Sequence, residues 1–178
     1  MSDFPKFVEI HEEGPREGFQ IEPGPISTVD KIKLIDALSK TGLKHIQACS
    51  FVNPRLVPGW ADAEQVVEGF MAHDGVEYTG LYFNGNGLDR ALAFKDKLTI
   101  SGSISLTASE GFTKKNLNRT HEENMSAMKR HVMSHLELGI PVNRIGVMAA
   151  FGCNYEGDIS PDTVVKTLRD GMAIAQDT

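Results

Sequence analysis

The sequence predicts an α/β protein built around a parallel sheet. Short apolar runs alternate with helix-like segments along the chain, and five successive strand–helix units can be distinguished. Alternation of this kind is typical of parallel strands that are joined by helices. We find no low-complexity segment and no evident linker, so we expect a single domain over residues 1–178. On this pattern alone, a doubly wound sheet and a (β/α)8 barrel both remain possible.

The composition excludes several classes of protein. A length of 178 residues with 40% hydrophobic residues is enough for one domain with its own core. The formal net charge of -6 argues against a protein that coats nucleic acid. Two cysteines, Cys49 and Cys153, are too few for a disulfide scaffold and fit a reducing compartment. Residues 1–6 have no signal-peptide pattern, and no apolar stretch is long enough to span a membrane, so we expect a cytoplasmic protein.

Three strand–helix units are expected in the first part of the chain. The predicted strands cover about 7–11, 45–50 and 78–83, and the predicted helices cover about 28–42, 62–72 and 88–94. Ser27 or Thr28 caps the first helix, and Gly42 ends it. The apolar positions at helical spacing are Ile32, Ile35 and Leu38 in the first helix and Val66, Val67 and Phe70 in the second. Residues 84–87 are expected to form a tight turn.

Two further units follow. Their strands are expected at about 98–106 and 144–150. Thr120 and Glu123 form a capping box that opens one helix, which Gly139 ends. Ser160, followed by Pro161 at the first helical position, caps the other. The predicted inner faces consist of Met125, Met128, Val132 and Leu136 in the first of these helices and of Val164, Val165, Leu168 and Met172 in the second.

The segment Gly14–Glu22 is predicted to be a loop between the first strand and the first helix. It holds one arginine and two carboxylates between glycines. Arginine presents a fixed positive fork to a carbonyl, enolate or carboxylate oxygen, and an adjacent carboxylate can bind a hard divalent cation. At the carboxyl end of a strand, such residues could form an active site. The alternative, a polar turn with a surface ion pair, is slightly favoured by the spacing alone.

Four other stretches accompany this segment in a characteristic order, at residues 31–36, 50–58, 112–116 and 152–157. Together with Gly14–Glu22 they resemble the 3-hydroxy-3-methylglutaryl-CoA (HMG-CoA) lyase family, and the resemblance runs from about Phe7 to about Ala175. It selects the (β/α)8 TIM barrel, of which this chain would supply about the first five units. Such a barrel typically needs about 250 residues. We therefore expect about three units to be missing, either from a fragment or from a natural truncation.

The resemblance implies a metal-dependent carbon–carbon lyase. Such an enzyme cleaves HMG-CoA, or a close analogue, to acetyl-CoA and a keto acid such as acetoacetate by retro-Claisen cleavage, with Mg²⁺ or Mn²⁺ as cofactor. Arg16 matches the family's catalytic arginine. Glu17 stands in the place of its metal-binding aspartate and reaches about one bond further. Gln47 stands in the place of a catalytic glutamate and cannot act as a base.

The resemblance also suggests an acyl-CoA partner and the residues that would contact it. These residues are Gln20, Asn84, Ser109, Lys114 and Asn116. The family's remaining metal ligands, a His-x-His pair and an asparagine, come from later strands and do not occur in the corresponding form within these 178 residues. A role in leucine catabolism and a homodimer are further implications, and partners among nucleic acids or membranes are not expected.

Several residues have alternative interpretations. Cys49 and Cys153 are expected to be packing residues, although Cys153 could line the site. His45 shares a strand face with Cys49, but no zinc-like cluster is expected around them. His131 and His135 could share a metal, but a solvated helix face is the preferred interpretation. The alternative for the whole chain is a non-catalytic or partner-completed half-barrel that serves as a binding module.

Overall fold

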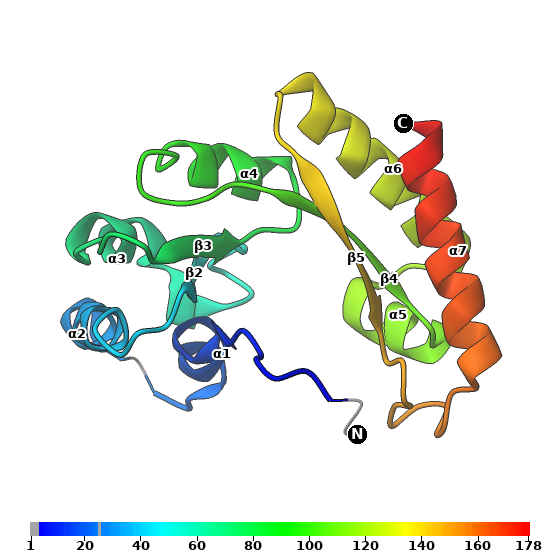
Figure 1. The fold of residues 1–178 in the computed structure, drawn as a ribbon, viewed down its shortest axis with the longest axis horizontal. Helices are drawn as coiled ribbons and strands as arrows, with labels where there is room; N and C mark the ends of the chain where they lie inside the picture. Colours follow the sequence, from blue (N-terminus) through cyan, green and yellow to red (C-terminus); the bar gives the residue numbers. More distant parts are fainter. Residues whose placement is uncertain (1–3, 25) are drawn as a thin grey trace. The chain divides into compact units, whose positions relative to one another are not determined.

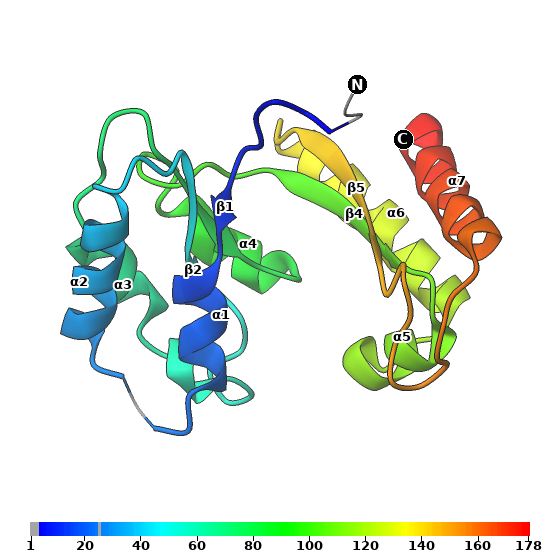
Figure 2. The same cartoon turned by 60° about the horizontal axis from the view of Figure 1, so that its bottom comes forward.

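A computed structural model describes residues 4–24 and 26–178 (Figures 1 and 2). We found no signal-peptide pattern in the sequence of residues 1–6. Residues 1–3 of this segment lie outside the described residues. The chain divides into two compact units, Met1–Ile100 and Ser101–Thr178. We describe each unit by itself, and the single domain stays a prediction.

The first unit contains a parallel sheet of three strands in the order β1 (His11–Glu12), β2 (His45–Ser50) and β3 (Glu77–Leu81). Its helices are α1 (Gly14–Ile21), α2 (Thr28–Leu38), the 3-10 turn η1 (Pro58–Trp60), α3 (Ala63–Gly69) and α4 (Gly85–Leu92). The pairing of β2 with β3 is regular up to Gln47 and shifts between Gln47 and Cys49. β2 occupies the predicted range 45–50, whereas β1 has only two residues where we predicted a strand at 7–11.

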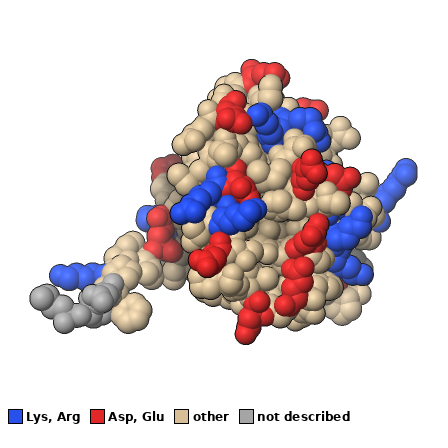
Figure 3. All heavy atoms as spheres, turned by 90° about the vertical axis from the view of Figure 1, so that its right-hand side faces the viewer, with Lys and Arg blue, Asp and Glu red and all other residues tan. Residues whose placement is uncertain are grey.

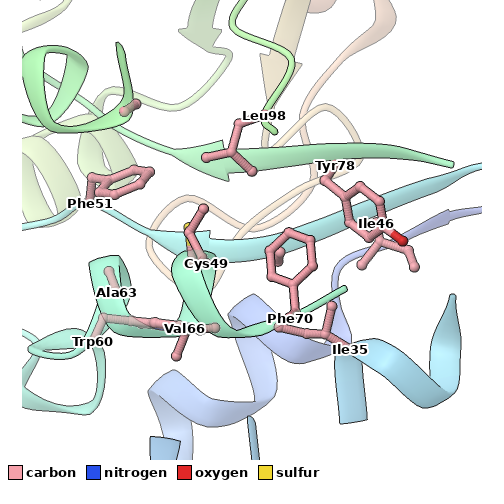
Figure 4. Packing of buried hydrophobic residues seen from close by; sticks show 13 residues of the cluster. Ile35, Ile46, Cys49, Phe51, Trp60, Ala63, Val66, Phe70, Tyr78 and Leu98 are labelled. Atoms are coloured by element: carbon pink, nitrogen blue, oxygen red, sulfur yellow. The ribbon is translucent and has the colours of Figure 1, made fainter. Parts of the chain in front are cut away.

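The core of the first unit lies between one face of this sheet and its helices, which Figure 4 shows from close by. Ile46 and Ala48 of β2 are buried in it, whereas His45 and Gln47, which alternate with them, are only partly buried. The other core side chains include Ile35, Cys49, Phe51, Trp60, Val66, Val67, Phe70, Tyr78 and Leu98. The predicted inner faces of α2 and α3, and the packing role of Cys49, are therefore confirmed.

The second unit contains two parallel strands, β4 (Gly102–Thr107) and β5 (Val142–Met148), and the helices α5 (Glu110–Leu117), α6 (His121–Glu137) and α7 (Pro161–Asp177). α6 and α7 pack against each other and against both strands. The predicted capping box is confirmed, because the Thr120 side chain accepts from the Glu123 N–H and the Glu123 carboxylate accepts from the Thr120 N–H. The cap at Ser160 is also confirmed.

The predicted inner faces of α6 and α7 are partly wrong. Leu136 in α6 and Val165, Leu168 and Met172 in α7 are exposed, and the buried residues are Asn124, Val132 and His135 in α6 and Thr167, Gly171 and Ile174 in α7. Small residues allow α7 to approach the strands closely: a Cβ atom on Gly171 would lie 2.8 Å from Cγ2 of Ile145. The Thr167 hydroxyl is satisfied within the helix, because it donates to the Thr163 carbonyl at 2.9 Å.

His131 and His135 do not form the solvated helix face that we predicted. His135 is buried, and its Nδ1 atom lies 2.8 Å from the carbonyl oxygen of His131. The two rings lie 4.0 Å apart. His131 is partly buried, and this burial lowers its pKa to about 4, so that the ring is neutral at physiological pH. The pair thus belongs to the packed side of α6.

Two segments that we predicted as a loop and a turn are helical, and a third motif also lies in a helix. Gly14–Ile21 forms α1, which Pro15 can open because proline fixes φ and its missing N–H is not needed in the first turn. The predicted turn at 84–87 begins α4, because the Asn84 side chain caps that helix. The stretch at 112–116 lies within α5, which Ser109 caps in the same way. Asn84 and Ser109 are therefore helix-capping signals, whereas α1 has no capping side-chain hydrogen bond at Glu13.

The strand ends also differ from the predictions. Phe7, Val8 and Ile10, which we assigned to the first strand, are exposed and precede β1. β4 begins at Gly102 instead of 98, because Leu98 belongs to the core of the first unit and the Thr99 N–H donates to the Tyr78 carbonyl there. β3 and β5 begin one and two residues earlier than predicted, at Glu77 and Val142.

The surface carries both signs of charge. Figure 3 shows Lys and Arg side chains interspersed with Asp and Glu on one face. Ion pairs of this kind include Lys166 with Asp170 within α7 and Lys129 with Asp177 between α6 and α7. Among the described residues, no helix has both the length and the apolarity that crossing a membrane requires.

Candidate functional site

The first part of the candidate site is the opening turn of α1, which carries Arg16. The backbone of this turn is fixed from two sides: Pro15 is buried, and the Trp60 indole N–H donates to the Arg16 carbonyl at 3.0 Å. Trp60 itself is fully buried in the core. The Arg16 side chain is only 14% exposed, so its guanidinium is largely enclosed by neighbouring residues.

The guanidinium of Arg16 contacts three side chains. Its Nε donates to Oε1 of Gln47 at 2.5 Å, its Nη2 donates to Oε2 of Glu13 at 2.7 Å, and its Nη1 donates to Glu17. The structure therefore brings together Arg16, Glu17 and Gln47. Glu13 was missed, because the segment was taken as a loop. In a helix, a glutamate three residues before an arginine lies on the same face, and this spacing is the signal that could have identified it.

The charge of this group is uneven. One guanidinium faces two carboxylates, and the Glu13 and Glu17 side chains are about half exposed, at 48% and 54%. The group thus carries one more negative than positive charge when all three are ionised. A ligand that brings positive charge can draw an exposed carboxylate away and leave an Arg16 N–H free to bind an oxygen.

The described residues do not complete a metal site around Glu17. A group of three donors that could hold an ion occurs among them at Glu9, His11 and His45, whose ligand atoms all lie within 4.8 Å of one another. Glu17 is not part of this group. We expected no zinc-like cluster around His45 and Cys49; the strand pairing places His11 beside His45 as a further potential ligand, whereas Cys49 is not part of the group.

Gln20 and Asn84, two of the predicted substrate contacts, have different surroundings. Gln20 lies near the end of α1 and lines a hollow of about 800 Å³, together with Phe19, Lys31, Pro58 and Asp62. Lys31 is buried there, and its ammonium group donates to Asp62 and to the Gly59 carbonyl. The amide oxygen of Asn84, in contrast, accepts from the Gly87 N–H and serves as a helix cap.

The second unit joins two of the sequence motifs, residues 112–116 and 152–157. Ser109, which is buried, accepts from the Phe112 N–H at 3.0 Å and from the Cys153 thiol at 3.1 Å. Glu156 accepts from the Gly111 N–H at the start of α5. The contact with Ser109 and this backbone bond lower the pKa of Glu156, which keeps it charged at the positive end of the helix.

Lys114 and Asn116 lie on α5, which the same motifs hold in place. Both residues are exposed. The Asn116 amide donates to the Phe112 carbonyl one turn earlier. Lys114 therefore places an exposed positive charge on the surface of the second unit, where it also interacts with Glu123, whereas Ser109 is buried and bonds its neighbours.

The two cysteines are expected to react very differently. Cys49 is fully buried, and this burial raises the pKa of its thiol, whereas the Ser109 hydroxyl can donate to the Cys153 thiolate and so lowers the pKa of Cys153. Since the thiolate is the reactive form, iodoacetamide at neutral pH should modify Cys153 and spare Cys49 in the folded chain. Peptide mass mapping measures this, and Ser109→Ala should slow the reaction. Equal modification of both cysteines in the folded chain would contradict this account.

The chain resembles HMG-CoA lyases over most of its length. It is 40% identical over 170 residues to the cytoplasmic 3-hydroxy-3-methylglutaryl-CoA lyase of Rattus norvegicus, covering 95% of this chain and 48% of that protein. It is 42% identical over 166 residues to the mitochondrial hydroxymethylglutaryl-CoA lyase of Gallus gallus, covering 93% and 54%. The chain thus spans about half the length of these relatives. No family model matches it.

Solved structures give the same result for the fold. The hydroxymethylglutaryl-CoA lyase of Pseudomonas aeruginosa superposes with a TM-score of 0.84 at 32% identity, covering 96% of this chain and 55% of that one. An HMG-CoA lyase from Acinetobacter baumannii, solved in complex with coenzyme A and 3-methylmalate, has a TM-score of 0.80 at 30% identity, covering 98% and 56%. The predicted fold class is confirmed: the chain has the fold of part of an α/β TIM barrel.

Proposed function

We propose that this chain provides part of the active site of a carbon–carbon lyase that cleaves HMG-CoA, or a close analogue, to acetyl-CoA and a keto acid. The observation that carries the proposal is the group formed by Arg16, Glu17 and Gln47, in which a guanidinium is held by an amide and a carboxylate. The resemblance to relatives that are named HMG-CoA lyases supports the same activity.

Arg16 is the residue that we propose to contact the reacting atoms. In a retro-Claisen cleavage, the bond to the departing keto acid breaks and its electrons pass into the thioester, whose oxygen becomes an enolate oxygen. A planar guanidinium can donate two N–H groups to that oxygen, and the donation strengthens as the negative charge develops. The Nη1 atom, which contacts the half-exposed Glu17, is the donor that can be released for this purpose.

Gln47 is proposed to position Arg16 and not to move protons. Its carbonyl oxygen accepts from Arg16 Nε, which fixes the plane of the guanidinium. An amide takes up no proton near neutral pH, so the proton on the substrate hydroxyl passes to another group. The departure from the family's glutamate at this position favours a change in substrate or in pH dependence within the same reaction class.

The proposed cofactor is Mg²⁺ or Mn²⁺, with Glu17 as one ligand. When bound, such a cation polarises a substrate oxygen. Glu17 offers a half-exposed carboxylate, but the described residues supply no set of three donors around it. Mg²⁺ requires an octahedral shell, so we expect the 178-residue chain alone to bind Mg²⁺ weakly or not measurably.

The proposed substrate-binding residues are Gln20, Asn84, Ser109, Lys114 and Asn116. Lys114 is the strongest candidate for a phosphate contact, because its ammonium group is exposed on α5. Ser109 would act indirectly by fixing the start of that helix. A location in the cytoplasm and a homodimer remain predictions, since the relatives include proteins named cytoplasmic and proteins named mitochondrial.

A turnover assay tests the proposal. Protein expressed from the complete reading frame is given a panel of CoA thioesters, including HMG-CoA, with Mg²⁺, with Mn²⁺ and after treatment with a chelator. We expect acetyl-CoA to be released from HMG-CoA or a close analogue only when a divalent cation is present. Absence of cleavage across the panel in a folded, metal-loaded protein would reject the proposal.

A further inference from the structure

The three strands of the first unit each begin with a polar residue. His11, His45 and Glu77 are the first residues of β1, β2 and β3, and the sheet pairs His11 with His45 and His45 with Glu77. Side chains at paired positions lie on the same face of a sheet. Glu9 lies two residues before β1. Four potential donors therefore gather at the amino ends of these strands.

The ring of His45 is at the centre of this group. Its Nδ1 atom lies 2.9 Å from Oε2 of Glu77, and its Nε2 atom lies 2.5 Å from Oε1 of Glu9. The ring of His11 is stacked on it, with the centroids 4.1 Å apart and the planes 6° from parallel. The ligand atoms of Glu9, His11 and His45 lie within 4.8 Å of one another.

We propose that Glu9, His11 and His45 bind a transition-metal ion of the zinc type, with Glu77 orienting the ring of His45. Two ligands about 2.1 Å from a tetrahedral zinc ion lie roughly 3.4 Å apart. The ligand atoms here lie within 4.8 Å of one another, so binding an ion requires the exposed Glu9 and His11 side chains to shift and the His11 ring to tilt out of its stack on His45. A carboxylate on the second nitrogen of a ligating histidine is the usual support for such a site, and Glu77 occupies that place.

The chemistry of the donors distinguishes this site from the one proposed around Glu17. Imidazole nitrogens favour Zn²⁺, Ni²⁺, Cu²⁺ or Fe²⁺, whereas Mg²⁺ and Ca²⁺ are bound by oxygen ligands. Three protein ligands leave one tetrahedral position for water. The inference does not depend on the proposed lyase activity, because it uses none of the residues assigned to that reaction.

The competing account of the same geometry contains no metal. In it, a protonated His45 lies between Glu9 and Glu77 as an ion pair. That arrangement uses the His11 ring only for stacking on His45, although a ring nitrogen of His11 lies within 4.8 Å of the ligand atoms of Glu9 and His45. A bound metal ion would be coordinated by the rings of both His11 and His45. It would also tie β1, which is only two residues long, to β2, and so fix the start of the segment that leads into α1.

Metal titration tests the proposal. The chain is treated with a chelator, dialysed and titrated with ZnCl₂ by calorimetry, and its complex with Co²⁺ is examined by visible absorption. We expect one Zn²⁺ per chain, no displacement by millimolar Mg²⁺, and Co²⁺ absorption bands of a nitrogen- and oxygen-ligated ion. His11→Ala and His45→Ala should each weaken binding at least about a hundredfold, and Glu77→Gln should weaken it about ten- to a hundredfold.

Two variants act as controls. His121→Ala removes a histidine of α6 that is outside the group, and it should leave zinc binding unchanged. Glu9→Gln removes a ligand at an exposed position, so it tests the site even if His45→Ala disturbs folding. Absence of zinc binding to the folded chain overturns the proposal in favour of the metal-free ion pair. Zinc binding that survives in both His11→Ala and Glu9→Gln also overturns it, since the ion would then lie elsewhere.

Discussion

Replacing Arg16 by lysine is expected to lower kcat about a hundred- to thousandfold in the complete, metal-loaded protein while the thermal midpoint changes little. Lysine keeps the charge but loses the planar, two-pronged donor. The loss should fall on kcat more than on KM, because the interaction strengthens as the enolate forms. Stability should hold because Arg16 pairs with half-exposed carboxylates, and such pairs contribute at most about 1 kcal/mol.

The matched control is Gln47→Glu, which replaces the other side of the same contact. It restores the residue expected in the family and retains an oxygen acceptor for Arg16 Nε. We expect it to change activity or substrate choice without abolishing turnover. Steady-state kinetics and a thermal melt are recorded for both variants. Near-full kcat in Arg16→Lys, with an unchanged melt, would show that Arg16 does not contact the reacting atoms.

Truncating Trp60 to alanine is expected to lower the free energy of unfolding of the first unit by about 3–5 kcal/mol. Trp60 is fully buried and the largest side chain in this core, and its ring packs 6.0 Å from that of Phe19 in α1. Removing it leaves a cavity and also frees the Arg16 carbonyl. Such a loss is a large share of the roughly 5–15 kcal/mol that stabilises a typical domain.

One further variant separates the packing of Trp60 from its hydrogen bond, and a second serves as a control on the surface. Trp60→Phe keeps most of the packing and loses the indole hydrogen bond, so part of the stability and the position of Arg16 should change together. Phe151→Ala removes an aromatic ring that is 96% exposed and should shift stability by less than about 0.5 kcal/mol. Urea unfolding is followed by circular dichroism, because the chain has a single tryptophan and loses that fluorescence signal in the variants. An unchanged midpoint in Trp60→Ala would show that η1 does not anchor the core.

The sequence predicted best those elements whose local signals agreed with their packing. β2 was placed correctly because its apolar residues Ile46, Ala48 and Cys49 are buried, and α6 and α7 were placed correctly because Thr120 and Ser160 cap them. Their inner faces were harder to predict. The close approach of α7 depends on Gly171, a residue that no hydrophobic pattern marks as buried.

The candidate site was predicted in part for a related reason. Arg16 and Gln47 were each singled out by the resemblance, but their contact depends on how α1 packs against β2 across 31 residues of sequence. Glu13 was missed because a glycine–proline start was taken for a loop when it opens a helix. The group of Glu9, His11 and His45 was missed because β1 was predicted with the wrong extent, so that its register with β2 could not be deduced from the sequence.

The shift in pairing between Gln47 and Cys49 has a consequence for which sequence changes β2 can accept. Gln47 pairs with Thr79 and Cys49 pairs with Gly80, so Ala48 is an extra residue in β2. It separates the partly buried polar residue Gln47 from Cys49, which is buried in the core. Because side chains alternate strictly along a regular strand, deleting Ala48 would turn either Gln47 or Cys49 to the opposite face. Residues on either side of the irregularity can therefore be exchanged independently, whereas a change in length at this point disrupts both the site and the core.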